Sequence, residues 1–206
     1  MKSHNEDEYR KPPVTPSVDW QYPSPSGGLD LFIGPGASKA ELCLQFLPTL
    51  VLAFAMTGWA GIKMESWSWW QFIVFWILLV DMIGGVITNA TASAKRWYHR
   101  YQIAAKDHLL FVALHAIQPL LIVILFAPEN PMYFVVTFGW LLVGALMILK
   151  CAVYLQRPCA GAWVVAGILL EQAVLDTPEG FEWFFAVYLI KVLMSHLLLE
   201  APYKAN

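Results

Sequence analysis

The sequence predicts an all-α, polytopic integral membrane protein, a bundle of six transmembrane helices preceded by an extended proline-rich N-terminal arm. Three observations lead to this fold class. The 206 residues are 58% hydrophobic and only 14% charged, whereas soluble domains average about 45–50% and about 25%. The apolar residues gather in long runs separated by short polar segments. The ten Trp residues suit the membrane–water boundary, where this side chain is enriched.

Residues 1–40 form a separate polar segment, which we expect to be a mostly extended cytoplasmic arm. The segment is rich in Pro, Ser and Gly, and such a composition cannot bury enough apolar surface to order itself alone. Residues 1–38 can also dock on the membrane surface or on a protein partner through Trp20, Tyr22, Leu31 and Phe32.

Six apolar runs make up the predicted bundle over residues 41–206. They cover 42–62, 67–90, 109–127, 131–155, 159–175 and 181–199. Most reach the roughly 20 residues that a helix needs to cross the hydrocarbon layer. The connections between them are short, so consecutive spans are expected to be antiparallel neighbours. The fifth run is the least regular, because Glu171 and Gln172 follow its apolar part. A re-entrant segment is the alternative there.

The distribution of basic residues predicts that both termini are cytoplasmic. In a six-span arrangement, Lys63 is the only basic residue expected on the side of the membrane opposite the N-terminus. Ten basic residues lie on the N-terminal side: Lys2, Arg10, Lys11, Lys39, Lys95, Arg96, Arg100, Lys106, Arg157 and Lys204. Because Lys and Arg concentrate in cytoplasmic loops, this side is expected to be the cytoplasm.

Three ionisable residues within the spans are the candidate catalytic residues: Asp81, His115 and His196. At about 1.5 Å rise per residue, all three lie at one level in the cytoplasmic half of the bilayer. Pro119 has no N–H for the carbonyl of His115, so a kink and a polar niche with Gln118 are expected there. Ionisable groups in spans usually pair or line a cavity. We therefore expect the three residues to converge on one polar cavity near the cytoplasmic face.

Asp81 also has a purely structural interpretation. Gly84 and Thr88 share its helical face, and small residues there let a neighbouring helix approach closely. A helix-packing face with one polar hydrogen bond is therefore the alternative to a catalytic site.

The histidines also raise the question of a metal or haem. His108 lies seven residues before His115, and His196 lies four before Glu200, so each pair shares a helical face. These four residues are candidate ligands for zinc or iron in a helical bundle. His115 and His196, at matching depth, are candidate axial ligands of a haem. No established ligand spacing such as HExxH is present, so the cofactor is left open.

Two further sets of residues are expected to have partners. Glu171 and Lys191 lie on consecutive antiparallel runs near the membrane midplane, and an unpaired charge there is costly, so an ion pair between them is predicted.

Basic and aromatic side chains alternate in the main cytoplasmic loop: Lys95, Arg96, Tyr98, His99 and Arg100. They are candidate ligands for an anionic lipid headgroup. Their alternative role is to orient the protein in the membrane. Nucleic-acid binding is not expected for so short a patch.

Three classes of function fit these features. The favoured hypothesis is a membrane-embedded enzyme that acts on a lipid-soluble or amphiphilic substrate by acid–base chemistry. The first alternative is a small proton-coupled transporter, in which the same groups relay protons. The second is an accessory subunit of a membrane complex that docks through its arm. The sequence does not decide among them.

The charge distribution gives a direct prediction of topology. A reporter fused after Asn206 is expected to report the cytoplasm, and one inserted within residues 176–180 is expected to report the exterior. Protease protection of tagged protein in sealed vesicles provides an independent measurement. A C-terminus outside the cytoplasm would contradict an even number of crossings.

Overall fold

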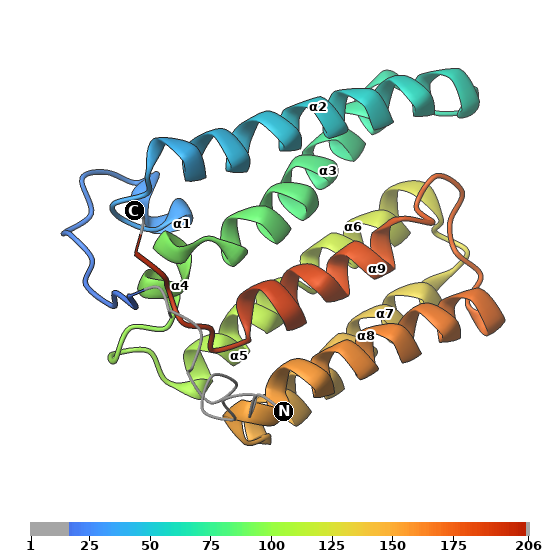
Figure 1. Ribbon diagram of the computed structural model, residues 1–206. Coiled ribbons are helices and arrows are strands. Elements are labelled where there is room, and N and C mark those ends of the chain that lie inside the picture. The colour runs from blue at the N-terminus through green and yellow to red at the C-terminus, as the bar shows by residue number, and fades with distance from the viewer. Residues whose placement is uncertain (1–16, 205–206) are drawn as a thin grey trace, which may run out of the picture.

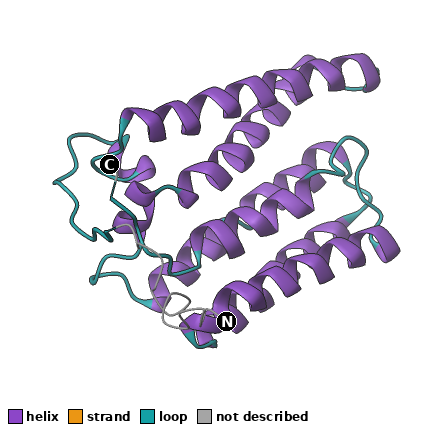
Figure 2. Cartoon of the chain, viewed as in Figure 1, coloured by secondary structure: helices purple, strands orange, loops and turns teal. Residues whose placement is uncertain are grey.

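The computed structural model describes residues 17–204, and every regular element within them is a helix (Figure 1 and Figure 2). In chain order the helices are α1 (Asp30–Ile33), α2 (Lys39–Lys63), α3 (Trp69–Ala90), α4 (Ala92–Tyr98), α5 (Ala105–Leu114), α6 (Ile117–Phe126), α7 (Pro131–Lys150), α8 (Val153–Val174), α9 (Phe184–Leu189) and η2 (Ile190–His196). The last of these, η2, is a π-helix that continues α9 directly.

Five of these helical segments are long and apolar enough to cross a membrane: α2, α3, Ala105–Phe126 (α5 with α6), α7 and α8. They confirm an all-helical, multi-pass integral membrane protein. The helix at the fifth predicted run, α8, is longer than the run of 159–175, because it begins at Val153 and contains Arg157 and Pro158. With 22 residues, α8 is long enough to cross, so no re-entrant segment is needed.

The sixth predicted span differs from the expectation of a full-length apolar helix. The segment Phe184–His196 is shorter than a spanning helix, and it lies between α3 and the α7–α8 pair (Figure 1). None of its side chains is exposed, and nine are buried: Phe184, Phe185, Tyr188, Leu189, Lys191, Val192, Leu193, Ser195 and His196. A helix covered by protein does not have to match the thickness of the hydrocarbon layer, which explains why a shorter helix suffices here.

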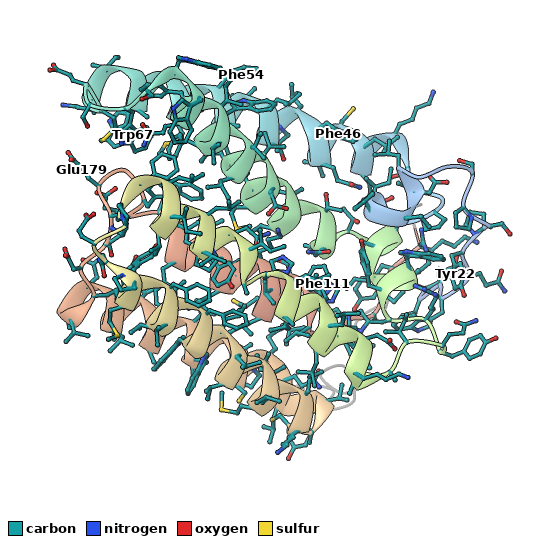
Figure 3. The ribbon with its side chains drawn as sticks, turned by 180° about the vertical axis from the view of Figure 1, so that it is seen from behind. Tyr22, Phe46, Phe54, Trp67, Phe111 and Glu179 are labelled. Carbon is teal, nitrogen blue, oxygen red and sulfur yellow. The ribbon has the colours of Figure 1, made fainter. Side chains whose placement is uncertain are left out.

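This central helix joins the two ends of the bundle. At one end, the ring of Phe181 packs against Phe126 at 4.8 Å and against Phe75 at 5.4 Å between centroids. Trp67 joins the same aromatic cluster and lies near Glu179 (Figure 3). At the other end, the ring of His196 contacts Tyr98, 5.2 Å away.

The two ends of the described chain meet at the end of the bundle that holds α4. Val18 and Tyr203 form an antiparallel bridge, and the N–H of Asp19 donates to the carbonyl of Pro202 at 2.8 Å. Both described ends therefore lie on the same side of the bundle.

The described part of the arm, residues 17–38, packs on its own bundle. The ring of Tyr22 meets Trp97 edge-on at 5.6 Å. Gly34 has a φ of +83° and touches the backbone of Ser93 so closely that a Cβ atom would overlap it. Glu41, which caps α2 together with Ser38, also accepts from the N–H of Ser93 at 3.0 Å. The earlier part of the expected arm, residues 1–16, lies outside the described residues, and docking of the arm on a protein partner stays a prediction.

Helices α7 and α8 are joined by a reciprocal tryptophan pair. The indoles of Trp140 and Trp163 stack at 4.3 Å. Each N–H donates to the other residue's carbonyl, at 3.3 and 3.1 Å. Gly144 and Gly167, each four residues after one of these tryptophans, provide the space that the indoles occupy. A Cβ atom at Gly144 would lie 2.5 Å from Trp163.

Replacement of Gly144 by Ala is therefore expected to destabilise the protein. The added methyl overlaps an indole that is held on both sides, and overpacking of this kind costs about 1–3 kcal/mol. Thermal unfolding in detergent measures the effect. Gly139→Ala is the matched control, because no atom lies within 4 Å of a Cβ there. Equal melting temperatures for the two variants would contradict this packing.

Candidate functional site

An ion pair between Asp81 and Lys191 joins α3 to the central helix. Lys191 Nζ donates to Asp81 Oδ1 at 2.8 Å. The Lys191 side chain is only 4% exposed, whereas that of Asp81 is 42% exposed. Gly85 makes the approach possible, because a Cβ there would come within 2.8 Å of Lys191 Cδ and closer still to Cε. The carboxylate is thus held by a buried ammonium group and keeps an accessible side.

The break between α5 and α6 brings Gln118 to the ion pair. α5 ends at Leu114 and α6 begins at Ile117, as Pro119 predicted. The carbonyl of His115, which has no helical donor, accepts instead from the hydroxyl of Tyr188 at 2.7 Å. Beyond the break, Gln118 Nε2 donates to Asp81 Oδ2 at 2.9 Å. The kink therefore brings an amide to the carboxylate and anchors His115 to the central helix.

The imidazole of His115 has one nitrogen bound and one free. Its Nδ1 lies 2.7 Å from the carbonyl oxygen of Phe111. Because a carbonyl can only accept, Nδ1 carries the proton in this contact and Nε2 of the neutral ring does not. Nε2 has no hydrogen-bond partner, although the residue is buried, with 6% exposed. His115 therefore offers an unoccupied acceptor.

These groups line a cavity of about 510 Å³ between α2 and α3 on one side and α5 on the other. Phe46 on α2 and Phe111 on α5 lie on opposite sides of it (Figure 3). Its polar lining includes Gln45, Asp81, Thr88, His115, Gln118 and Lys191, and its apolar lining includes Leu29, Phe32, Phe46, Val80, Phe111 and Leu114. We call this cavity the α3–α5 groove. Small-molecule sites usually combine such an apolar wall with a few polar groups.

His196 does not share the groove, contrary to the expected convergence of three residues. Its Nε2 lies 3.2 Å from Nδ1 of His108, and its ring stacks on Phe111 at 3.6 Å. The ring of Phe111 also contacts His115 at 4.4 Å. The sequence argument used only the depth of each residue in the bilayer, which does not determine the side of the helix on which a side chain lies. On the central helix Lys191, not His196, faces Asp81 and the groove.

The candidate metal ligands do not gather at one point. In the part of the chain that the structure describes, no group of three or more His, Cys, Asp or Glu side chains is placed to hold a metal ion. His108 meets His196, but His115 lines the groove and Glu200 pairs with Lys95 at 3.2 Å. The expected haem ligands, His115 and His196, do not face a common space. This arrangement corrects the expectation of a shared ligand set.

Glu171 does not pair with Lys191, which is a second correction. Glu171 lies in the last turn of α8, and its Oε1 accepts from the hydroxyl of Thr177 at 3.4 Å. Lys191 lies deeper in the bundle, in η2, and is bound to Asp81. Because α8 ends at Val174, Glu171 lies beside the loop that follows it, while the ammonium group of Lys191 is directed to Asp81 on α3.

Most of the basic and aromatic loop is bound within the chain. Lys95 is 3% exposed, and its Nζ donates to the carbonyls of Ser195 and Leu198 at 2.7 and 2.9 Å. Burial lowers the pKa of Lys95, while Glu200 acts in the opposite direction. These contacts fill the unpaired carbonyls at the end of the central helix.

The neighbouring loop residues have similar structural partners. His99 Nε2 donates to the carbonyl of His196 at 2.8 Å, and burial lowers the pKa of His99 to about 4. The hydroxyl of Tyr98 donates to the carbonyls of Leu31 and Phe32 at 3.0 and 3.1 Å. Burial raises the pKa of this hydroxyl.

The two arginines of the loop differ in their contacts. The guanidinium of Arg100 lies 3.8 Å over the ring of Trp97, and Nε of Arg96 has no hydrogen-bond partner. Headgroup binding by this loop stays a prediction, and four of its five candidate side chains already have partners within the chain.

No protein-family model, curated protein or solved structure matches the chain. The site is therefore interpreted from its own chemistry. Sequence reasoning identified Asp81, His115 and Gln118 as members of a polar niche, and it missed Lys191 as the partner of Asp81. One signal was available, because the two opposite charges lie within about one helical turn of each other in depth.

The ion pair predicts an unequal response at two adjacent glycines. Gly85→Ala is expected to push Lys191 away from Asp81 and to lower stability by about 1–3 kcal/mol. The control, Gly84→Ala, meets only Thr49 Cγ2 at 3.2 Å and is expected to cost less. Thermal unfolding measures both. In a Lys191→Ala background the cost of Gly85→Ala should disappear, and an unchanged cost would show that the glycine serves another contact.

Proposed function

We propose that this protein is a membrane-embedded enzyme that admits an amphiphilic, lipid-soluble molecule into the α3–α5 groove and acts on its polar group. The observation that carries the proposal is a cluster of ionisable and amide side chains at the wall of a mostly apolar, open groove. Asp81, Lys191, Gln118 and His115 supply the cluster. Ionisable groups within membrane spans are rare and mark functional sites by default.

The walls of the groove support entry from the bilayer. Phe46 and Leu114, which belong to spanning segments, line it and are 44% and 55% exposed. In a helix that crosses a membrane, such exposed apolar side chains face lipid tails. A molecule dissolved in the bilayer can therefore enter sideways, with its apolar part against these residues.

The polar cluster supports acid–base chemistry on the part of the molecule that reaches it. His115 Nε2 is an unoccupied acceptor, so His115 is the proposed general base. Asp81 and Lys191 carry opposite charges within hydrogen-bonding distance, so they can stabilise charge that develops beside them. His196, which the sequence also indicated as a candidate catalytic residue, packs against Phe111 and His108 and has no catalytic role in this proposal.

We further propose that both termini are cytoplasmic. The basic residues of the described chain support this orientation, because Lys95, Arg96, Arg100, Lys106 and Arg157 all belong to the end of the bundle where the two chain ends meet. Lys and Arg concentrate on the cytoplasmic side. The site would then open in the cytoplasmic half of the bilayer.

Photo-crosslinking at two neighbouring positions tests the proposed groove. Benzoylphenylalanine replaces either Phe46, which lines the groove, or Leu47, which is exposed and does not line the groove. After irradiation in native membranes, intact-protein mass spectrometry is expected to find a discrete adduct at position 46. Position 47 should give only the mixture of bulk lipids. Equal adduct patterns at both positions would contradict a groove ligand.

The contribution of the polar cluster is tested in the same assay. Asp81→Asn is expected to reduce the discrete adduct severalfold, because it removes the charge that holds Lys191 and Gln118. Asp107→Asn is the matched control, since Asp107 accepts only from the N–H of Ala104 at the start of α5. An adduct that both variants leave unchanged would rule out a role for the cluster in binding.

A proton-coupled transporter is the second candidate. The Asp81–Lys191 pair favours it, because protonation of Asp81 would break an ion pair inside the membrane. A pH-sensitive dye trapped inside proteoliposomes reports proton flux through the protein and so distinguishes the two functions. A proton flux that Asp81→Asn abolishes and Asp107→Asn does not would replace the enzyme proposal. Stoichiometric partners that are lost on deletion of residues 1–38 would instead favour a subunit of a larger complex.

A further inference from the structure

We infer that the molecule held in the α3–α5 groove is an uncharged lipid alcohol, whose hydroxyl group donates to His115. This inference rests on the proposed function and names the class of ligand. Three polar atoms without hydrogen-bond partners belong to residues that line the groove: His115 Nε2, Gln118 Oε1 and Gln45 Nε2. All three atoms are enclosed by protein, so a ligand reaches them only when their side chains turn toward the groove. Buried polar groups are nearly always hydrogen-bonded, so the unfilled capacity of these atoms indicates which polar group a ligand has to bring.

The two unpartnered atoms beside the ion pair are both acceptors. His115 Nδ1 faces a carbonyl, which fixes the proton on Nδ1 and leaves Nε2 as an acceptor. The Gln118 amide faces the Asp81 carboxylate, which also accepts only, so its NH₂ group points there and Oε1 is the free atom. In each case the neighbouring group determines which atom remains, and both remaining atoms accept.

A hydroxyl group fits this pattern better than a group without a proton. It can donate to His115 Nε2 or Gln118 Oε1, and its oxygen can accept from the ammonium of Lys191, which uses one of its three protons on Asp81. An ether, ester or ketone offers no donor and leaves both buried acceptors unfilled, whereas a hydroxyl group fills one of them. Loss of a hydrogen bond to a buried group typically costs about tenfold or more in affinity.

The charges of the groove exclude an anionic headgroup. Lys191 is the one Lys or Arg among the residues that line it, and its charge is balanced by Asp81 at 2.8 Å. A phosphate or carboxylate would meet Asp81 and two acceptor atoms without an unpaired cation. The other unpartnered atom, Gln45 Nε2, is a neutral donor on α2, and it suits a second oxygen of the same molecule.

Competition with the groove adduct tests this inference on the full-length protein in lipid nanodiscs. The probe molecules are oleyl alcohol, oleyl methyl ether, oleic acid and oleyl phosphate, each added at a stated mole fraction of the lipid. Diacylglycerol and cholesterol distinguish a glycerolipid from a sterol as the source of the hydroxyl. Each is added before irradiation, because the photo-adduct is covalent. Oleyl alcohol is expected to displace the groove ligand, and so to suppress formation of the adduct at position 46, at about one-tenth of the concentration that the methyl ether needs.

Two histidine variants on one helix check the proposed acceptor. His115→Leu is expected to remove the preference for the alcohol over the ether. The control is His108→Leu, since His108 lies on α5 outside the groove and its loss should keep the preference. The alcohol-to-ether concentration ratio in the protein that carries only the position-46 probe tests the inference even if a histidine variant does not fold.

The outcomes separate the inference from the proposal on which it rests. Equal displacement by the alcohol and the ether, or stronger displacement by the phosphate or the acid, overturns the hydroxyl inference and leaves groove binding intact. A missing adduct at position 46, or one whose formation no amphiphile suppresses, overturns the proposed groove ligand as well. A preference for the alcohol over the ether that is lost in His115→Leu supports both.

Discussion

The ion pair between Asp81 and Lys191 is the constraint on which the rest of the structure depends. A single charge within the hydrocarbon layer costs about 2.5–3.5 kcal/mol on insertion scales, so neither residue is tolerated there alone. The pair fixes the rotation of the central helix against α3, and Gly85 permits the close approach. Gln118 then reaches the same carboxylate from beyond the α5–α6 break. One electrostatic requirement thereby positions three helices.

The central helix has a second requirement, which is met at the end of the bundle beside α4. Its last carbonyls have no helical donors. Lys95 and His99 fill these acceptors at Ser195, Leu198 and His196. Basic side chains that resemble a lipid-binding loop in the sequence thus complete a helix end in the structure. Their charge can still orient the protein in the membrane, because the two roles use different properties of the same residues.

The groove is a consequence of how α2 is attached. Among the long helices α2 packs chiefly against α3, so a space remains between this hairpin and α5, with α1 at its end. The ion pair lies on the wall of that space, and Asp81 keeps an exposed side because it is bound from only two directions. A neutral pair of opposite charges beside two free acceptors recognises hydroxyl groups better than charged ones. Packing and chemistry therefore point to the same kind of ligand.

The sequence by itself determined the membrane class, the extent of most spans and the kink at Pro119, because hydropathy and the missing N–H of proline act locally. It also selected Asp81 and His115, since charge within a span is visible without a structure. The partners were decided only by the tertiary structure. Depth along a helix follows from residue number, but rotation about its axis depends on every neighbour. Lys191 rather than His196 therefore reaches Asp81, while Glu171 remains near the outer end of α8.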